Sequence, residues 1–371
     1  MFGQNQINTI SHMIDKSQKV LVIYGGGSIK KNGVYQQISR ALEGYQWQEF
    51  SGVGSNPTKE KMDEAVTLIK EQKIVFIHAV GGGSVVDGSK YAAAAAYYSG
   101  DGWDIMTGRY QPRVALPIGV ILTIPATGSE SNTSFVVTKA KTNEKITSVA
   151  GCVQPRFAVM DPDVMKTLPD KQLTNGIVDA WVHVCEQYLT KPRGALVQDG
   201  YSEALLRTLK TLGDTYQDHD NDTWRSNLMW AANQALNGLI TVGVEQDWAT
   251  HMIGHELTAI WHVDHARSLS IIQPSLLRNQ IKYKRGKLEQ MGRNVFGFEN
   301  SPDLAERTID AIETFYLSLG LPVKLQDYGC SKEEAIDAVV SKLEHFGMKA
   351  LTENRTITPS VVREILDEAI I

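Results

Sequence analysis

Two segments of this sequence repeat one order of residues: a short apolar run, then three glycines, then a serine. Residues 19–24 precede Gly25-Gly26-Gly27-Ser28, and residues 73–80 precede Gly81-Gly82-Gly83-Ser84. Short apolar runs bounded by glycine are typical of strands buried on both faces of a parallel sheet. A helical pattern follows each turn, so the repeat predicts an α/β domain.

The rest of the chain divides near residue 170. Further strands are predicted at 120–125 and 156–160, and helices at 34–42, 62–70 and 85–98. From residue 171 onward the apolar spacing predicts only helices, at 175–189, 200–212, 223–239, 249–260, 304–319 and 331–345. We therefore expect an α/β domain over 1–170 and a helical domain over 171–371.

The two glycine turns are candidate phosphate-binding sites. Glycine lets a backbone approach a ligand closely, and a helix that begins there offers free N–H groups and a positive dipole end. Neither turn matches GxGxxG or GxxxxGK[ST], so the common dinucleotide and ATP motifs are absent. The alternative is that each segment is only a turn between a strand and a helix.

A group of histidines and one aspartate indicates a metal site. Four of the nine histidines lie between residues 251 and 265, namely His251, His255, His262 and His265. Upstream, Asp179 and His183 are four residues apart on an apolar helical pattern, so they share one face. Imidazole and carboxylate together suit Zn(II) or Fe(II). An exposed surface pair is the alternative for Asp179 and His183. A zinc-protease HExxH motif is excluded, because Ala259 stands where the second histidine is needed.

Charge, cysteine content and hydropathy argue against a nucleic-acid-binding, a disulfide-rich or a membrane-spanning protein. The formal net charge is −5, which argues against a nucleic-acid-binding surface. The 3 cysteines are far apart, which argues against a disulfide framework and favours a reducing cytoplasm. The N-terminal residues lack a signal-peptide pattern, and no apolar stretch of ~20 residues is present to span a membrane.

These segments together resemble the iron-containing (group III, metal-dependent) alcohol dehydrogenases, in particular the butanol dehydrogenase and YqhD-type aldehyde reductase branch. The resemblance is carried, in order along nearly the whole chain, by the segments 24–31, 80–88, 125–130, 179–183, 249–257 and 264–266.

The family implies a Rossmann-like parallel-sheet domain, a helical domain of the dehydroquinate-synthase type, and one divalent metal ion, Fe(II) or Zn(II). Its metal positions fall on Asp179, His183, His251 and His265. His255 matches a further histidine that is not a ligand. The positions that contact the cofactor in the family fall on Gly25, Gly26, Gly27, Ser28, Gly82, Gly83, Ser84, Asp87, Thr123, Thr127 and Lys145.

The reaction implied is the reduction of an aldehyde by NAD(P)H to a primary alcohol, and its reverse. The metal ion is expected to act as a Lewis acid, and the nicotinamide to carry the hydride. His255 is expected either to relay the proton or to support the ligands. Gly27 leaves the first turn without an acidic side chain, which favours NADP over NAD in this family, and Lys30 and Lys31 add positive charge nearby.

Two alternatives and one departure stand beside this interpretation. A lyase like dehydroquinate synthase shares the fold, NAD and a metal, but needs a basic pocket for a sugar phosphate. A catalytically silent nucleotide-binding protein would not need the four metal positions. Family members usually carry an extra segment ending in a strand before the equivalent of Phe2-Gly3, and we find no such strand here. In the family this strand pairs at the edge of the fold, near the contact of the expected homodimer.

Overall fold

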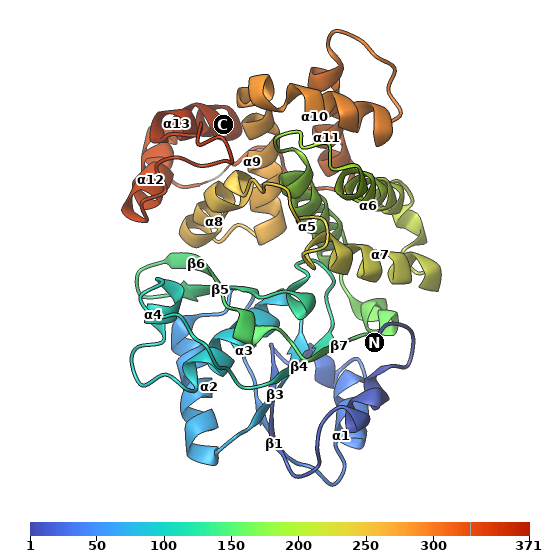
Figure 1. The fold of residues 1–371 in the computed structure, drawn as a ribbon, viewed down its shortest axis with the longest axis vertical. Helices are drawn as coiled ribbons and strands as arrows, with labels where there is room; N and C mark the ends of the chain where they lie inside the picture. Colours follow the sequence, from blue (N-terminus) through green and yellow to red (C-terminus); the bar gives the residue numbers. More distant parts are fainter. Residues whose placement is uncertain (327) are drawn as a thin grey trace. The chain divides into compact units, whose positions relative to one another are not determined.

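The computed structural model describes residues 1–326 and 328–371 (Figure 1). The chain forms two compact units that interleave in sequence. The first contains Met1–Leu173 and Asp218–Asn233, and the second contains Thr174–Gln217 and Gln234–Ile371. Each unit is described below by itself.

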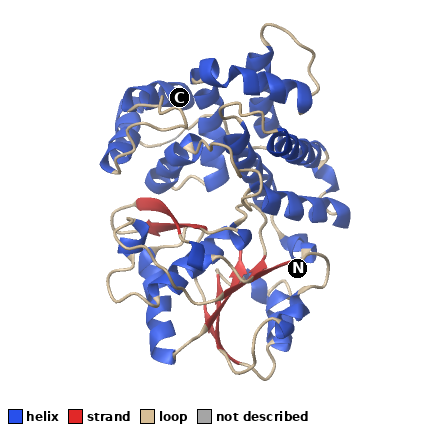
Figure 2. Ribbon diagram, in the orientation of Figure 1, coloured by secondary structure: helices blue, strands red, loops and turns tan. Residues whose placement is uncertain are grey.

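The first unit is built on a five-stranded parallel sheet in the order β2-β1-β3-β4-β7. The strands are β1 (Lys19–Tyr24), β2 (Gln46–Phe50), β3 (Phe76–Gly81), β4 (Ile118–Leu122) and β7 (Phe157–Met160). The predicted parallel sheet is confirmed, and the central strands β3 and β4 are buried throughout. The strands are drawn as red arrows in Figure 2.

Strand β2 has no counterpart among the predicted elements. Its sequence is Gln-Trp-Gln-Glu-Phe, and only its last residue, Phe50, is buried. β2 lies at one edge of the sheet, where it needs no continuous apolar run. At the other edge Met1–Gly3 extends the sheet, because Gly3 N–H donates to the Met160 carbonyl over 3.1 Å and Phe2 forms a parallel bridge with Met160.

The helices of this unit cover the sheet. They are α1 (Val34–Ala41), α2 (Lys59–Gln72), α3 (Gly83–Ala95), α4 (Trp103–Met106) and α7 (Asp222–Ala235), the last residues of α7 belonging to the second unit. α3 is the most buried, because its run of alanines lets it pack closely against β3 and β4. Short 3-10 turns of this unit occur at Ile7–His12, Ser28–Lys30, Ser129–Ser131, Gly151–Val153 and Pro162–Thr167, and a further one, Tyr216–Asp218, begins in the second unit.

A two-stranded antiparallel hairpin was also not predicted. Its strands are β5 (Ser134–Lys139) and β6 (Glu144–Val149), and β5 packs on α3. Burial alternates along both strands, with Phe135 and Val137 facing the core. This period of two over only six residues is a weaker sequence signal than the continuous apolar runs of the parallel sheet.

The second unit is helical. Its helices are α5 (Asp170–Tyr188, from Thr174 on), α6 (Leu196–Asp214), α8 (Ala249–Trp261), α9 (His265–Asn279), α10 (Ile281–Asn294), α11 (Leu304–Ser318), α12 (Lys332–His345) and α13 (Pro359–Ala369). Those predicted near α5, α6, α8, α11 and α12 are confirmed within a few residues. α7 was also predicted, but its contacts group it with the first unit, whereas the expected boundary near residue 170 places it in the second. Among the described residues, no helix combines the length and apolar character needed to cross a bilayer.

Candidate functional site

Three helices of the second unit supply the predicted metal positions. α5 presents Asp179 and His183 one turn apart, and both side chains are buried. α8 presents His251, and α9 begins with His265. His262 ends α8 in the left-handed conformation, with φ 57°, and this reversal brings the start of α9 back toward His251.

The donor atoms of these four residues converge. His183 Nε2 lies 3.1 Å from His251 Nε2. Asp179 Oδ1 lies 3.7 Å from His183 Nε2 and 3.5 Å from His265 Nε2. All four donor atoms lie within 4.8 Å of one another. Ligands ~2.0–2.1 Å from a tetrahedrally bound ion are roughly 3.3 Å apart, so this spacing suits one metal ion.

The chemistry of the donor set also fits a cation. Asp179 Oδ1 is buried and has no hydrogen-bond partner in the described part of the chain, which is costly for a carboxylate unless a cation compensates it. Three imidazoles and one carboxylate are ligands that Zn(II) and Fe(II) accept. The His265 side chain is 27% exposed, whereas the Asp179 and His183 side chains are each 4% exposed. Solvent therefore reaches the cluster beside His265.

His255 lies one helical turn after His251 on α8 and is buried. Its ring centroid is 6.0 Å from that of His251 and 5.3 Å from that of His265. It is outside the group of four converging donor atoms. This position is compatible with both predicted roles, proton relay and support of the neighbouring rings, and the choice between them stays a prediction.

Glu186 is a buried neighbour of the cluster that was missed in the sequence. It lies on α5, three residues after His183, and its Oε2 atom lies within hydrogen-bond distance of His251 Nδ1. Burial first, and the charge of Asp247 second, raise the pKa of the Glu186 carboxyl well above its usual range. A divalent cation nearby acts in the opposite direction, by favouring the ionised carboxylate. The only sequence signal was a glutamate at helical spacing from His183 on an apolar helix.

The first glycine turn leaves open space beside its backbone. A Cβ atom added at Gly26 or Gly27 would meet nothing within 4 Å, whereas one at Gly25 would lie 3.3 Å from the Val53 carbonyl oxygen. Gly27 has φ 95°, which favours glycine. The helix predicted at 34–42 is confirmed as α1, which does not follow this turn directly. Ser28 instead begins a 3-10 turn, and α1 starts only at Val34. The backbone N–H groups that directly follow the glycines therefore belong to a single 3-10 turn and not to the start of an α-helix.

The second glycine turn is shaped by its protein neighbours. A Cβ atom at Gly83 would lie 2.3 Å from Thr127 Oγ1, and one at Gly82 would lie 3.0 Å from Ile124 Cβ. These glycines therefore allow close packing of α3 against the loop after β4. The N–H group of Thr123, at the start of that loop, donates to the Gly81 carbonyl over 3.0 Å.

Polar side chains around the second turn are engaged within the protein. Asp87 Oδ1 accepts from Ser129 Oγ over 2.5 Å, and Asp87 Oδ2 accepts from the Val136 N–H group over 3.0 Å. Ser84 Oγ donates to the Ser55 carbonyl over 2.6 Å. Lys145 lies on β6, buried. The contacts that these residues were predicted to make with a cofactor stay predictions.

Lys90, a second residue that was missed in the sequence, stabilises the same loop. Its ammonium group donates to Ser129 Oγ over 2.9 Å, to Asn132 Oδ1 over 3.0 Å and to the Ser134 carbonyl over 2.7 Å. Burial lowers the pKa of Lys90 to about 8, although Asp87 acts against this shift. Lys90 thus fixes the segment that carries Thr127 above the second glycine turn.

An ion pair lies beside the first glycine turn. Lys30 Nζ is 2.8 Å from Glu49 Oε2, and Glu49 also accepts hydrogen bonds from the hydroxyl groups of Tyr24 and Tyr35. Burial alone would raise the pKa of the Glu49 carboxyl, but hydrogen bonds from Lys30 and the two tyrosines prevail and lower it to about 2. The positive charge predicted near this turn is therefore partly compensated by Glu49.

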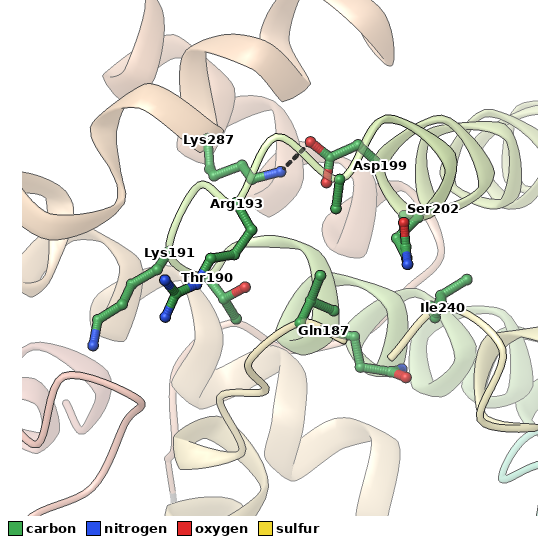
Figure 3. Close-up of a pocket in the computed structure, with 11 residues that line it drawn as sticks. Gln187, Thr190, Lys191, Arg193, Asp199, Ser202, Ile240 and Lys287 are labelled. Carbon is green, nitrogen blue, oxygen red and sulfur yellow. Dashed lines mark ion pairs between the residues drawn. The ribbon is translucent and has the colours of Figure 1, made fainter. Parts of the chain in front are cut away.

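A polar pocket in the second unit is separate from the four converging residues (Figure 3). Lys287 of α10 faces Asp199 of α6 across it, with Nζ 2.6 Å from Oδ2. Its other cations are engaged too, since Arg193 pairs with Glu245 and Lys191 Nζ donates to the Glu353 carbonyl over 3.3 Å. The pocket therefore shows no surplus charge that indicates an anionic ligand.

Comparison with known proteins gives consistent matches. Residues 1–162 match the family model described as iron-containing alcohol dehydrogenase, and residues 174–370 match the model of the C-terminal part of the Fe-containing alcohol dehydrogenase family. The chain is 45% identical over 375 residues to the NADPH-dependent aldehyde reductase YqhD of Escherichia coli, covering 100% of this chain and 97% of the relative.

Two further matches support this assignment. A probable NADH-dependent butanol dehydrogenase of Bacillus subtilis is 37% identical over 350 residues, covering 92% of this chain and 90% of the relative. The crystal structure of YqhD from Escherichia coli K-12 superposes with a TM-score of 0.96, at 45% identity, over 99% of this chain and 96% of that one.

Proposed function

Because the chain belongs to the iron-containing alcohol dehydrogenase family, we propose that it reduces small uncharged aldehydes with NADPH as hydride donor. It is a metal-dependent oxidoreductase of alcohols and aldehydes that uses a nicotinamide dinucleotide. The matches do not favour the lyase alternative. The balanced reaction is aldehyde plus NADPH plus a proton, giving a primary alcohol and NADP⁺.

The metal ligands in this proposal are the four residues whose donor atoms converge, namely Asp179, His183, His251 and His265. The observation that carries the proposal is this convergence, together with a buried Asp179 oxygen that lacks a hydrogen-bond partner among the described residues. When bound there, a divalent ion supplies Lewis-acid polarisation of a carbonyl group.

Residues of this chain are proposed to position the metal ion and to deliver a proton to the substrate oxygen. The buried Asp179 and His183 on α5 form the enclosed side of the cluster, while the partly exposed His265 lies on the side proposed to be open to substrate. His255 is proposed to deliver the proton that the carbonyl oxygen gains on reduction, because a histidine titrates near neutral pH. Its alternative role is to support the His251 and His265 rings.

The dinucleotide is proposed to bind the two glycine turns of the first unit, with Gly25, Gly26, Gly27, Ser28, Gly82, Gly83 and Ser84 as contact positions. Thr123, Thr127 and Lys145 complete the proposed set. Asp87 is also proposed as a contact position; its two oxygens accept from Ser129 Oγ and from the Val136 N–H group.

The preference for NADPH rests on the first turn. An acidic side chain there would accept the ribose 2′-hydroxyl of NADH and repel the 2′-phosphate of NADPH. Gly27 carries no side chain, and the space beside it is open. Relatives of both kinds exist, since one is named as NADPH-dependent and another as NADH-dependent.

The cellular setting is also proposed. Cys152, Cys185 and Cys330 are free thiols, which supports a reducing compartment, and we place the enzyme in the cytoplasm. A homodimer is expected from the family, and light scattering on the purified protein tests it.

The test of the proposed function is NADPH oxidation with butanal after reconstitution of the metal-free protein with Fe(II) or Zn(II), with NADH in parallel. Turnover that requires metal and is faster with NADPH is expected. A folded, metal-loaded protein that turns over neither cofactor would overturn the aldehyde proposal, and phosphate release from 3-deoxy-arabino-heptulosonate 7-phosphate would then test the lyase alternative.

A further inference from the structure

We propose that Glu186 is the positioning residue that keeps the ring proton of His251 on Nδ1 and thereby holds Nε2 as the metal-binding atom. This inference rests on the proposed metal site. It adds a residue that acts on the metal ion through His251.

The two oxygens of Glu186 have separate partners. Oε2 lies within hydrogen-bond distance of His251 Nδ1, and Oε1 accepts from the backbone N–H groups of Thr250 over 2.7 Å and His251 over 3.3 Å. These N–H groups belong to the first turn of α8, where backbone donors have no partner within the helix. One carboxylate therefore fixes both the ring of His251 and the start of the helix that carries it.

The junction between α5 and the start of α8 is also held by hydrogen bonds of Asp247. The N–H group of Asp247 donates to the Glu186 carbonyl over 2.8 Å, and Asp247 Oδ1 accepts from the Ala249 N–H group over 2.9 Å. Asp247 Oδ2 lies 2.6 Å from Lys284 Nζ, so the charge of Asp247 is compensated. α5 and the beginning of α8 are thus joined at several points, and the side chain of Glu186 has little freedom to move.

The tautomer of His251 decides whether it can bind a metal ion through Nε2. A neutral imidazole carries one proton, on either Nδ1 or Nε2, and only the other nitrogen offers a lone pair. A divalent cation bound nearby favours the ionised form of Glu186, and an ionised carboxylate can only accept a hydrogen bond, so Glu186 then places the proton on Nδ1. The Nε2 atom, 3.1 Å from His183 Nε2, is then the one available to a metal ion.

Charge balance gives the same residue a second effect. Asp179 and Glu186 are both buried, and the three imidazoles are neutral when they bind metal. Two buried carboxylates offset the charge of one divalent cation, whereas Asp179 alone would leave a net positive charge in a buried place. Glu186 is therefore expected to increase affinity for a divalent ion as well as to orient His251.

Substitution by glutamine separates these effects from packing. In Glu186→Gln the amide oxygen can still accept from the Thr250 N–H group, but the amide NH₂ group then faces His251 Nδ1. Nδ1 must become an acceptor, which moves the ring proton to Nε2 and blocks the metal-binding lone pair. The change in volume is small, so a loss of metal affinity cannot be attributed to a cavity.

The chain offers a matched control. Glu203 is also buried in the second unit, and its Oε1 atom accepts hydrogen bonds from Tyr188, Gln290 and Asn294. Glu203→Gln makes the same chemical change in a hydrogen-bonded glutamate that does not contact the four converging residues. It is expected to bind metal as tightly as the wild type.

The experiment is a titration of the metal-free, full-length protein with Zn(II) against a chelating dye, and with Co(II) followed by its visible absorption. Glu186→Gln is expected to weaken Zn(II) binding ~10–100-fold and to change the Co(II) spectrum. Circular dichroism establishes that each variant is folded. An affinity equal to that of the wild type, or a loss no larger than that of Glu203→Gln, would overturn the inference.

Two further measurements distinguish the possible failures. If the wild type binds no stoichiometric metal ion, or if His251→Ala binds it equally well, the proposed metal site itself is wrong. If Glu186→Gln does not fold, histidine-ring NMR of the Zn(II)-loaded wild type still tests the inference, with the His251 signals assigned by comparison with His251→Ala. Ligation of His251 through Nδ1 would overturn it.

Discussion

The rings of His183 and His251 lie nearly parallel, with centroids 4.7 Å apart and planes inclined by 23°. Their Nε2 atoms approach to 3.1 Å, although they come from helices that are far apart in sequence. If both rings carry their protons on Nδ1, two lone pairs face each other at this distance. A cation shared by the two atoms removes that repulsion, so metal binding and the stability of this helix pair are coupled.

Removal of metal is therefore expected to lower the melting temperature. An ion that binds only the folded protein stabilises it by about 4 kcal/mol at a free concentration a thousand times Kd. Differential scanning calorimetry of the chelator-treated protein, repeated after addition of Zn(II), measures the change. Equal melting temperatures with and without the ion would contradict the coupling.

His251→Ala is expected to abolish stoichiometric metal binding, because it removes one of the four converging donors. The loss of affinity should exceed the ~10–100-fold typical of a lost partner that only supports a ligand. Metal content by elemental analysis and NADPH turnover provide the measurements. His345→Ala changes an exposed histidine on α12 and serves as the control, with metal content and turnover unchanged.

His78, on β3, is expected to make stability depend on pH. Its ring is fully buried, and burial lowers its pKa from 6.5 to about 4. Between these values the unfolded chain binds more protons than the folded chain, so this contribution is complete above pH 6.5 and is lost as the pH falls toward 4. The free energy of unfolding should fall by about 2 kcal/mol from pH 7 to pH 5 through this group. Urea unfolding of the wild type and His78→Leu tests this, and an equal pH dependence would contradict it.

Gly27→Asp is expected to reverse the cofactor preference. The new carboxylate would repel the 2′-phosphate, so the Kd for NADPH should rise roughly tenfold relative to that for NADH, or about 1.4 kcal/mol. Gly27→Ala is the matched control, because it imposes the same backbone strain at φ 95° without a charge. Fluorescence titration with both cofactors measures the ratio. If both variants shift it equally, charge is not the cause.

Gly83→Ala is expected to destabilise the first unit, because its Cβ would lie 2.3 Å from Thr127 Oγ1. Overpacking of this kind costs about 1–3 kcal/mol. Gly26→Ala, where a Cβ meets nothing within 4 Å, should cost much less. Chemical unfolding compares the two. Equal losses would show that the close contact with Thr127 is not the reason for glycine at position 83.

The parallel sheet and most of the helical unit followed from local patterns. The apolar runs that became β1 and β3 stand between polar segments and glycine turns, and α5 shows Asp179 and His183 at helical spacing. These signals are contained within one element, so the sequence carries them directly. α9, α10 and α13 were not predicted; α9 contains Pro274, and α10 is rich in lysine and arginine.

The surroundings of the site were less predictable. Glu186 and His251 are 65 residues apart, and no local sequence pattern predicts that they are in contact. Asp87 matched a cofactor position of the family, yet the structure engages its carboxylate with Ser129 and the Val136 N–H group, which lie on other segments. Such contacts depend on tertiary packing, which the spacing of residues along one element does not encode.

Because the chain reverses at the left-handed His262 between α8 and α9, the number of residues between His251 and His265 sets the position of the His265 side chain. Each residue of an α-helix turns the next side chain by about 100°. One residue added to α8 after His251, or one removed, would therefore change where the chain reverses and direct His265 away from Asp179. In this fold the length of the segment between two ligands is as much a part of the metal site as the ligands themselves.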